Sequence, residues 1–234
     1  MLILDRIPKK TTIIDGLPGV GVVSTIVTEY LIESLNAKLI GEIIIEDMPP
    51  IVAIHNKEVV RPFGIFYSEE KNILLLHGLT TPEGHEWQLS EEIMRLSQKT
   101  KARHILTIDG VPARDDKEPR TYFYTTNPEY RIELEKTGSK PINNGIVFGV
   151  TSFLLIKNQT IPHTCLFAET QLGLPDSKSA SALINELNKI LKIDIDATPL
   201  IKKSEAFERK LKEIISNAKD ATEFKKQKSM NYVG

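Results

Sequence analysis

The chain has 234 residues, with 30 Lys and Arg against 31 Asp and Glu, a formal net charge of -1 and 41% hydrophobic residues. This length and composition are typical of a globular protein that buries its own core. The balanced charge argues against a protein that coats nucleic acid. The single cysteine, Cys165, excludes an intrachain disulfide and a zinc site built from several cysteines.

We expect buried strands and amphipathic helices to alternate along the chain. Short apolar, β-branched runs predict strands, whereas apolar residues spaced three and four apart predict helices. The predicted strands cover residues 11–14, 39–45, 51–55, 58–66, 73–76, 104–108 and 163–168, and the predicted helices cover 22–35, 84–99 and 176–191. Segments 51–55 and 58–66 flank a polar turn and predict an antiparallel hairpin. Residues 111–141 are polar and rich in Pro and Tyr, which predicts a surface insertion.

This alternation predicts one α/β domain over residues 1–197. Helices between successive strands favour a mostly parallel sheet with helices on both faces. No run approaches the roughly 20 apolar residues that span a bilayer, so we expect no contact with a membrane. The first ten residues lack the long apolar stretch of a signal peptide, and we expect a cytoplasmic protein.

Residues 198–227 predict a long C-terminal helix, followed by a flexible tail over 228–234. Thr198 and Pro199 are typical of a helix start. Apolar residues then recur at spacings of four and three, as in the seam of a coiled coil. They are Phe207, Leu211, Ile214, Ala218 and Ala221. Because so long a helix has so narrow an apolar stripe, we expect it to pack against the same helix of other subunits in a homo-oligomer.

The near-neutral charge hides two unlike parts. Between Lys202 and Lys228 there are nine Lys and Arg and five Asp and Glu, a balance of +4, which leaves about -5 for the remainder. A basic arm on an acidic domain favours contact with an acidic partner surface or with a neighbouring subunit rather than with nucleic acid.

A glycine-rich loop, with Gly16, Gly19 and Gly21, lies between the first predicted strand and the first predicted helix. Free N–H groups at the start of a helix could hold a phosphate. The spacing, however, matches neither the dinucleotide-binding pattern nor the P-loop, and no Lys follows. A tight turn that needs glycine for close packing is the simpler interpretation.

Two carboxylates, Asp109 and Glu169, each follow a predicted central strand, where open α/β sheets place their ligand sites. They could bind a ribose or act as acid and base. They could equally cap the turns that follow them. In an enzyme of this fold, they and the glycine-rich loop would line a nucleoside- or phosphate-binding site.

The sequence lacks a coherent catalytic set. His85 begins a predicted helix, but Leu89 stands where the zinc-binding H-E-x-x-H pattern needs its second histidine. His77 and His85 have no third ligand nearby, which favours structural or surface histidines. No serine lies in a G-x-S-x-G turn, and Cys165 lies in an apolar run that is typical of a buried thiol. We therefore predict no enzymatic activity, no cofactor and no metal site.

Four aromatic residues fall within the polar segment 111–141. They are Tyr122, Phe123, Tyr124 and Tyr130. So dense a group is consistent with a protein interface and with a local core patch, and the sequence alone does not separate the two.

A series of short motifs occurs in the order typical of one family. They are Gly16-Leu-Pro-Gly-Val-Gly21, Met48-Pro-Pro50, His77-Gly78, Ile108-Asp-Gly110, Tyr124-Thr-Thr-Asn-Pro-Glu129, Gly145-Ile-Val-Phe-Gly149 and Phe167-Ala-Glu-Thr170. With the helices around them they span about residues 10–215, and this set resembles the archaeal branch of the proteasome-assembly-chaperone family. The resemblance implies a nucleoside-phosphorylase-like α/β fold used as a scaffold. It also implies a homo-oligomeric chaperone that assists 20S proteasome assembly without ATP.

The resemblance also implies a role for the end of the chain. Members of the family engage the proteasome α-ring through a C-terminal hydrophobic-Tyr-X motif that inserts between α subunits. Here the chain ends Met230-Asn-Tyr-Val-Gly234, so Tyr232 is third from last and Asn231 stands at the hydrophobic position. Contact with α subunits through Met230, Tyr232, Val233 and Gly234 would use a motif displaced by one residue. A nucleoside- or phosphate-binding enzyme, and an adaptor for another partner, are the alternatives.

Overall fold

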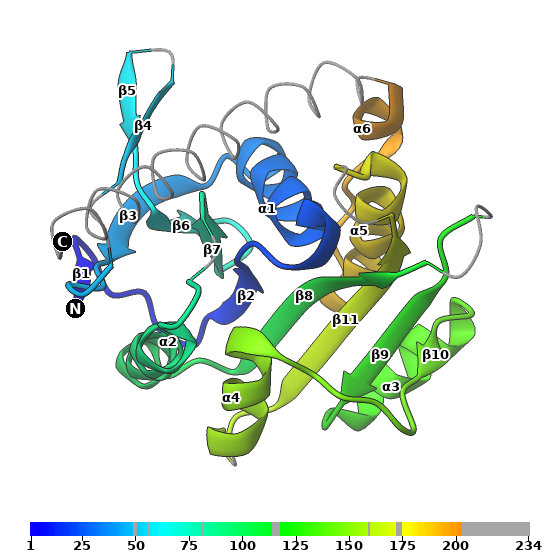
Figure 1. Cartoon of the computed structure of the whole chain (residues 1–234). Helices are drawn as coiled ribbons and strands as arrows, with labels where there is room; N and C mark the ends of the chain where they lie inside the picture. The colour runs from blue at the N-terminus through cyan, green and yellow to red at the C-terminus, as the bar shows by residue number, and fades with distance from the viewer. Residues whose placement is uncertain are drawn as a thin grey trace, which may run out of the picture.

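The computed structural model describes residues 1–48, 51–55, 57–80, 82–113, 118–158, 160–171 and 175–202. These residues form a nine-stranded sheet in the order β1-β3-β6-β7-β2-β8-β11-β9-β10 and a separate hairpin, β4-β5 (Figure 1). The strands are β1 Leu2–Leu4, β2 Thr12–Gly16, β3 Lys38–Ile43, β4 Ala53–His55, β5 Glu58–Val60, β6 Phe63–Ser68, β7 Ile73–Gly78, β8 His104–Pro112, β9 Thr121–Thr125, β10 Lys140–Pro141 and β11 His163–Thr170. The helices are α1 Val23–Ser34, α2 Glu86–Thr100, α3 Pro128–Lys136, α4 Gly149–Lys157, α5 Ser177–Leu191 and α6 Thr198–Lys202, and a single 3₁₀ turn, Val20–Val22, precedes α1.

Parallel strands form the centre of the sheet. β2 pairs in parallel with β7 on one side and with β8 on the other, and β8 pairs in parallel with β11. Ile14, for example, lies between Leu75 and Leu106. Antiparallel pairs extend this centre through β6, β3 and β1 at one side and through β9 at the other. The predicted α/β fold with a parallel sheet and flanking helices is therefore confirmed.

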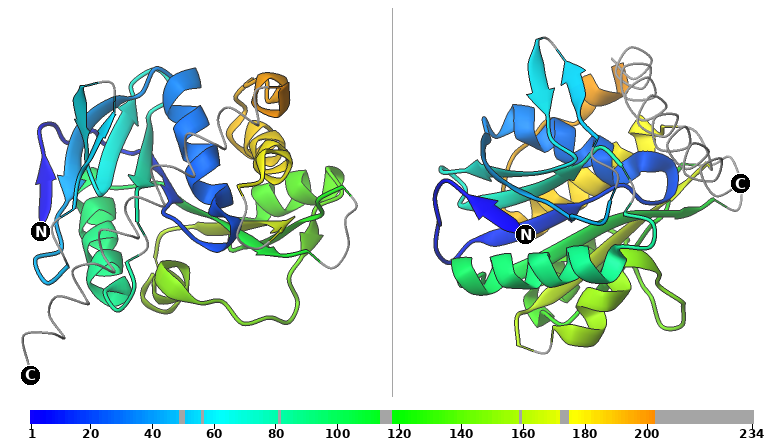
Figure 2. Two further views of the ribbon diagram at one scale, coloured as in Figure 1. Left: turned by 45° about the horizontal axis from the view of Figure 1, so that its top comes forward. Right: turned by 60° about the vertical axis from the view of Figure 1, so that its left-hand side comes forward.

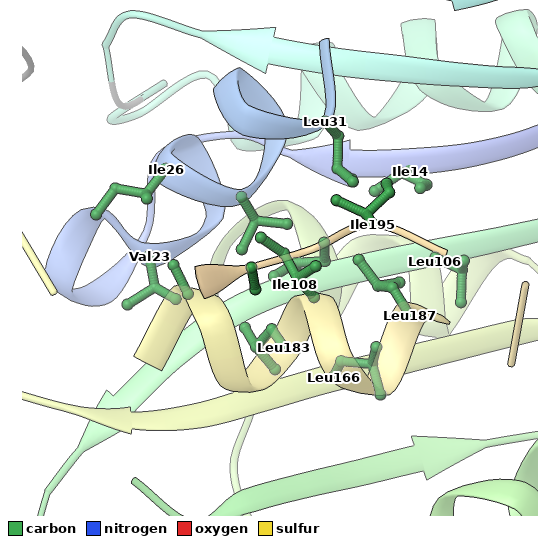
Figure 3. Close-up of a cluster of buried hydrophobic side chains, with 14 of the residues drawn as sticks. Ile14, Val23, Ile26, Leu31, Leu106, Ile108, Leu166, Leu183, Leu187 and Ile195 are labelled. Carbon is green, nitrogen blue, oxygen red and sulfur yellow. The ribbon is translucent and has the colours of Figure 1, made fainter. Parts of the chain in front are cut away.

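Helices cover both faces of the sheet (Figure 2). α1 and α5 pack together on one face, and α2 and α4 pack together on the other. Under α1 and α5, Ile14, Leu106 and Leu166 from the strands contact apolar helix residues (Figure 3). The helix residues in this cluster include Val23, Ile26, Leu31, Leu183 and Leu187, which recur at spacings of three to five and are completely buried.

The segment 58–66 is two strands rather than one, so that prediction was wrong in its extent. β4 and β5 form the expected antiparallel hairpin, with Ala53 opposite Val60. The chain then leaves the hairpin at Arg61 and Pro62, and β6 joins the main sheet between β3 and β7. Proline has no N–H to donate to a ladder, which accounts for the interruption.

The segment 111–141 is part of the domain and not a surface insertion, so that prediction was also wrong. β8 continues to Pro112, and β9 pairs antiparallel with β11, with Phe123 opposite Leu166. α3 follows, and the side chain of Asn127 caps it by accepting hydrogen bonds from the N–H groups of Glu129 and Tyr130. Hydrophobic content alone missed a strand that buries only alternate residues.

Of the long helix predicted over residues 198–227, the described part of the chain contains only the short helix α6, Thr198–Lys202. The seam residues Phe207, Leu211, Ile214, Ala218 and Ala221 and the tail residues Met230, Tyr232, Val233 and Gly234 lie outside the described residues. None of the helices that the structure describes has the length and apolar character needed to cross a membrane.

Candidate functional site

The carboxyl ends of β2 and β8 meet the loop that enters α1. The Asp109 Oδ1 atom accepts hydrogen bonds from the Val20 N–H at 2.9 Å and from the Gly110 N–H at 2.7 Å. A Cβ atom on Gly19 would lie 2.1 Å from this same Oδ1, so the loop can approach Asp109 only with glycine at position 19. Close packing therefore explains Gly19, as the simpler interpretation of the glycine-rich loop predicts.

Asp109 occupies the position that a bound phosphate would need. Its carboxylate already accepts the Val20 N–H, which a phosphate-binding loop would offer to its ligand. A phosphate at the start of α1 would compete with the Asp109 carboxylate for this N–H, and a second carboxyl group, Asp15, lies nearby. The geometry thus disfavours a phosphate at the glycine-rich loop.

A second buried carboxylate, Asp15, lies beside Asp109 at the end of β2. Its side chain accepts one hydrogen bond, from the Leu17 N–H at 3.2 Å, and the residue is 4% exposed. Burial, together with a smaller effect of the Asp109 charge, raises the pKa of Asp15 to about 7, against the lowering effect of the Leu17 hydrogen bond. Burial likewise raises the pKa of Asp109 to about 6, against the lowering effect of the Gly110 and Val20 hydrogen bonds.

Both carboxylates line a cavity of about 360 Å³. Its walls come from the end of β2, the loop into α1, β8, the start of α2 and the first turn of α4. Glu83 and Glu86 add carboxylates, whereas Leu17, Pro18 and Phe148 add apolar surface. This is the edge of a parallel sheet at which α/β proteins bind their ligands.

Asp15 did not figure among the residues singled out from the sequence. A signal for it exists, because the triplet Ile-Asp-Gly occurs twice, at Ile14-Asp15-Gly16 and at Ile108-Asp109-Gly110. Both copies end on adjacent parallel strands, and the repeated triplet therefore marks the two carboxylates that share the cavity.

Glu169, the other predicted carboxylate, does not join Asp109 at the cavity. Glu169 accepts hydrogen bonds from Arg120 Nε at 2.7 Å and from the Tyr122 hydroxyl at 2.9 Å. Burial acts to raise the pKa of Glu169, but these two hydrogen bonds and the charge of Arg120 together lower it. Neither carboxylate caps a turn, since Asp109 and Glu169 both lie inside their strands. Glu169 joins β9 to β11.

His77 and His85 both contact other side chains of the domain. His77 is buried, with Nδ1 3.0 Å from the Thr28 hydroxyl and Nε2 3.3 Å from Glu29. Although a hydroxyl, an imidazole and a carboxylate stand in line, Thr28 is completely buried and its hydroxyl also bonds the Ser24 carbonyl, so no substrate can reach it. His85 contacts Gln88.

The thiol of Cys165 is buried, which raises its pKa to about 12 and makes it a poor nucleophile. Within the described ranges, no three His, Cys, Asp or Glu side chains are placed to hold a metal ion.

The four aromatic residues of segment 111–141 divide between core and surface. Phe123 is completely buried and Tyr122 bonds Glu169, whereas Tyr124 is 42% exposed. The Tyr130 ring packs against His104 at 4.5 Å between centroids. These residues therefore anchor the β9 region to the domain.

Apolar side chains are exposed at two other places. One comprises Trp87 on α2, with Ile146 and Phe148 before α4, which are 58%, 81% and 79% exposed. The other is the β4-β5 hairpin, where Ile54 and Val59 face solvent. Exposed apolar surface of this extent is typical of protein contacts.

A model of the PAC2 family matches residues 13–215. The chain belongs to the PAC2 family. An uncharacterized protein from Methanocaldococcus jannaschii is 28% identical over 204 residues, which cover 86% of this chain and 84% of the relative.

Solved structures share the fold of this PAC2 protein over almost its full length. PbaA of Pyrococcus furiosus, described as an archaeal homolog of proteasome-assembly chaperone, is 24% identical with a TM-score of 0.81, over 94% of this chain and 98% of PbaA. PbaB of the same organism, described as an archaeal proteasome activator, is 23% identical with a TM-score of 0.76, over 92% of this chain and 98% of PbaB. A Thermoplasma acidophilum protein of unknown function is 19% identical with a TM-score of 0.82, over 96% and 93% of the two chains.

Proposed function

We propose that this PAC2 protein is a non-catalytic chaperone of 20S proteasome assembly, present in the cytoplasm and acting without ATP. The observation that carries the proposal is the family match over residues 13–215, joined to a fold shared with PbaA over nearly both whole chains. PbaA is described as a proteasome-assembly chaperone homolog and PbaB as a proteasome activator, and both descriptions concern the proteasome.

The chemistry of the described residues supports a scaffold rather than an enzyme. The carboxylates Asp109 and Glu169 do not share a site, and Cys165 and Thr28 are buried. The glycine-rich loop donates to Asp109 and leaves an unfavourable place for phosphate. The alternative of a nucleoside- or phosphate-binding enzyme with a phosphorylase-like fold is therefore not favoured.

We propose that three successive parts of the chain have different roles. Residues 1–197 form the α/β domain, residues 198–227 associate with the same segment of other subunits, and residues 228–234 reach the proteasome α subunits. Self-association would use Phe207, Leu211, Ile214, Ala218 and Ala221. Docking on α subunits would use Met230, Tyr232, Val233 and Gly234, with neither nucleic acid nor membrane as a partner.

Native mass spectrometry with purified α subunits tests the docking. We expect the wild-type chain to form a complex at low-micromolar concentration and Tyr232→Ala to weaken it. Ser229→Ala, which changes a neighbouring residue outside the motif, is the matched control and should leave the complex unchanged. No complex with the wild-type chain would overturn the proposal of a proteasome partner.

A further inference from the structure

The cavity at the ends of β2 and β8 is acidic. Asp15, Asp109, Glu83 and Glu86 line it, and none of its described lining residues is Lys, Arg or His. Because four carboxyl groups face one small volume without a cation among those residues, the ligand that complements them carries positive charge.

Two carboxylate oxygens in this cavity lack hydrogen bonds from the described residues. Asp15 Oδ1 accepts from Leu17, and Asp109 Oδ1 accepts from Val20 and Gly110, whereas the Oδ2 atom of each accepts none from the part of the chain that is described. Asp15 is 4% exposed, so its free oxygen lies almost entirely out of bulk solvent. Because both side chains line the cavity, a donor group of a bound ligand could give these acceptors the hydrogen bonds that they lack.

The chemistry of the lining residues favours an organic cation over a metal ion or an anion as the ligand. No group of three metal-ligating side chains converges anywhere in the described ranges, the cavity included. An anion would meet four carboxyl groups. An ammonium or guanidinium group has several N–H donors and reaches separated acceptors on a long apolar stem.

One exposed aromatic side chain lines the cavity, and two further exposed apolar residues lie near lining residues in the sequence. Phe148 lines it and is 79% exposed, Ile146 precedes it on the same segment, and Trp87 directly follows Glu86 on α2. The Trp87 ring meets Phe153 edge to face at 4.7 Å, which fixes its position. Aromatic residues and arginine are enriched at protein interfaces, so an acidic cavity with an exposed Phe148 favours a basic side chain of a protein as its ligand.

We propose that this cavity binds the cationic end of a lysine or arginine side chain presented by a protein partner, with Asp15 and Asp109 as acceptors and Phe148 as an apolar contact. The inference rests on the proposed function only in taking the partner to be a protein. The first turn of α4, through Val150 and Thr151, supplies N–H groups that suit a backbone carbonyl of the same partner.

Nuclear magnetic resonance titration of the full chain with single-residue probes tests the site. The probes are N-acetyl-lysine-N-methylamide and N-acetyl-arginine-N-methylamide, with the uncharged norleucine analogue as control. The basic probes should shift the amide signals of Gly19, Val20, Gly110 and Gly149 in a saturable way, and norleucine should not. Equal shifts with all three probes, no shifts, or larger shifts with inorganic phosphate or AMP would overturn the proposal.

Charge-removing variants test whether the basic probes bind through the carboxyl groups of the cavity or through the negative charge of the surface in general. Asp109→Asn keeps the oxygen that Val20 and Gly110 use and neutralises the free one, so the fold is preserved while affinity for the basic probes falls about tenfold or more. Asp15→Asn should act in the same way. Glu91→Gln, which removes an exposed carboxylate from α2 outside the cavity, is the matched control and should leave affinity unchanged. Equal losses in Glu91→Gln and Asp109→Asn would contradict the site.

The two proposals can fail separately. If wild-type chain captures α subunits but the basic probes leave the cavity signals unmoved, the cavity proposal is wrong and the proposed function stands. If the probes bind in the cavity but no α subunit is captured, the site stands and its partner is another protein. Loss of α-subunit capture in Asp109→Asn and Phe148→Ala, but not in Ile132→Ala, would place the proteasome partner at the cavity.

Discussion

The Asp109 carboxylate on β8 accepts a hydrogen bond from the backbone N–H of Val20, 89 residues earlier in the chain. This bond joins the loop into α1 to the neighbouring strand. It also uses the N–H group that a phosphate-binding loop would leave for its ligand. One contact thus stabilises the domain and argues against a nucleotide site.

Gly19→Ala tests the packing of this loop. The new Cβ would lie 2.1 Å from Asp109 Oδ1, which forces the loop or the strand to move. We expect the free energy of unfolding to fall by about 1–3 kcal/mol, measured by urea denaturation. Gly145→Ala is the control, because its Cβ would approach only the Cγ2 methyl group of Ile142, at 3.2 Å. Equal stability of the two variants would show that the loop is not held against Asp109.

Asp15→Asn tests the burial of a carboxylate beside the cavity. The pKa of Asp15 is raised from 3.8 to about 7, so the folded chain retains a proton that the unfolded chain has lost. The free energy of unfolding of the wild type therefore falls as the pH rises from about 4 to about 7. Asp15→Asn has no such proton to lose. The free energy of unfolding of the variant, relative to that of the wild type, should therefore be higher at pH 8 than at pH 4 by as much as about 4 kcal/mol.

Denaturation of both proteins at the two pH values measures this gain. Asp194→Asn, which changes an exposed aspartate, should show no such gain. A stability difference between Asp15→Asn and wild type that is the same at pH 4 and pH 8 would contradict a buried, protonated Asp15.

Glu169→Gln tests the link between β9 and β11. Glu169 is buried and pairs with Arg120 at 2.7 Å, so the substitution leaves the guanidinium with a weaker partner. We expect a loss of about 1–3 kcal/mol at pH 7. Because the folded-state pKa of Glu169 is lowered, its contribution is present above pH 4.5 and is lost as the pH falls. A loss that is as large at pH 3 as at pH 7 would rule out the ion pair as its cause.

Phe123→Ala tests whether segment 111–141 belongs to the core. Phe123 is completely buried, and removal of its ring should lower the free energy of unfolding by about 3–5 kcal/mol. Tyr124→Ala removes the exposed neighbour and should cost about 1 kcal/mol or less. Similar small effects of both substitutions in thermal denaturation would restore the view of this segment as a surface insertion.

Periodicity predicted the parts of the fold in which a whole face is buried. The helices at 22–35, 84–99 and 176–191 lie within two residues of α1, α2 and α5, because their apolar stripes pack directly on the sheet. β9 was missed because it alternates, with Phe123 inside and Tyr124 outside, among residues whose composition is polar. The break between β5 and β6 depended on Pro62, which hydrophobicity does not register.

The sequence predicted one of the two aspartates that line the cavity. Asp109 stands out because it directly follows the apolar run 104–108, and the structure places it at the cavity. Asp15 precedes the same kind of glycine but was overlooked, although the repeated Ile-Asp-Gly triplet pointed to it. Glu169 carried the same sequence signal as Asp109 and lies elsewhere, since its partner Arg120 comes from a segment whose path the sequence did not reveal.

Reconstitution of the 20S particle from separate α and β subunits tests the central claim most directly. Native mass spectrometry would follow the yield of complete particles over time, without ATP, with and without stoichiometric wild-type chain. Leu211→Glu together with Ile214→Glu serves as the variant that disrupts the proposed oligomer. Our account predicts faster or more complete assembly with the wild-type chain and a loss of that gain with the double variant. Identical time courses with and without the wild-type chain would contradict it.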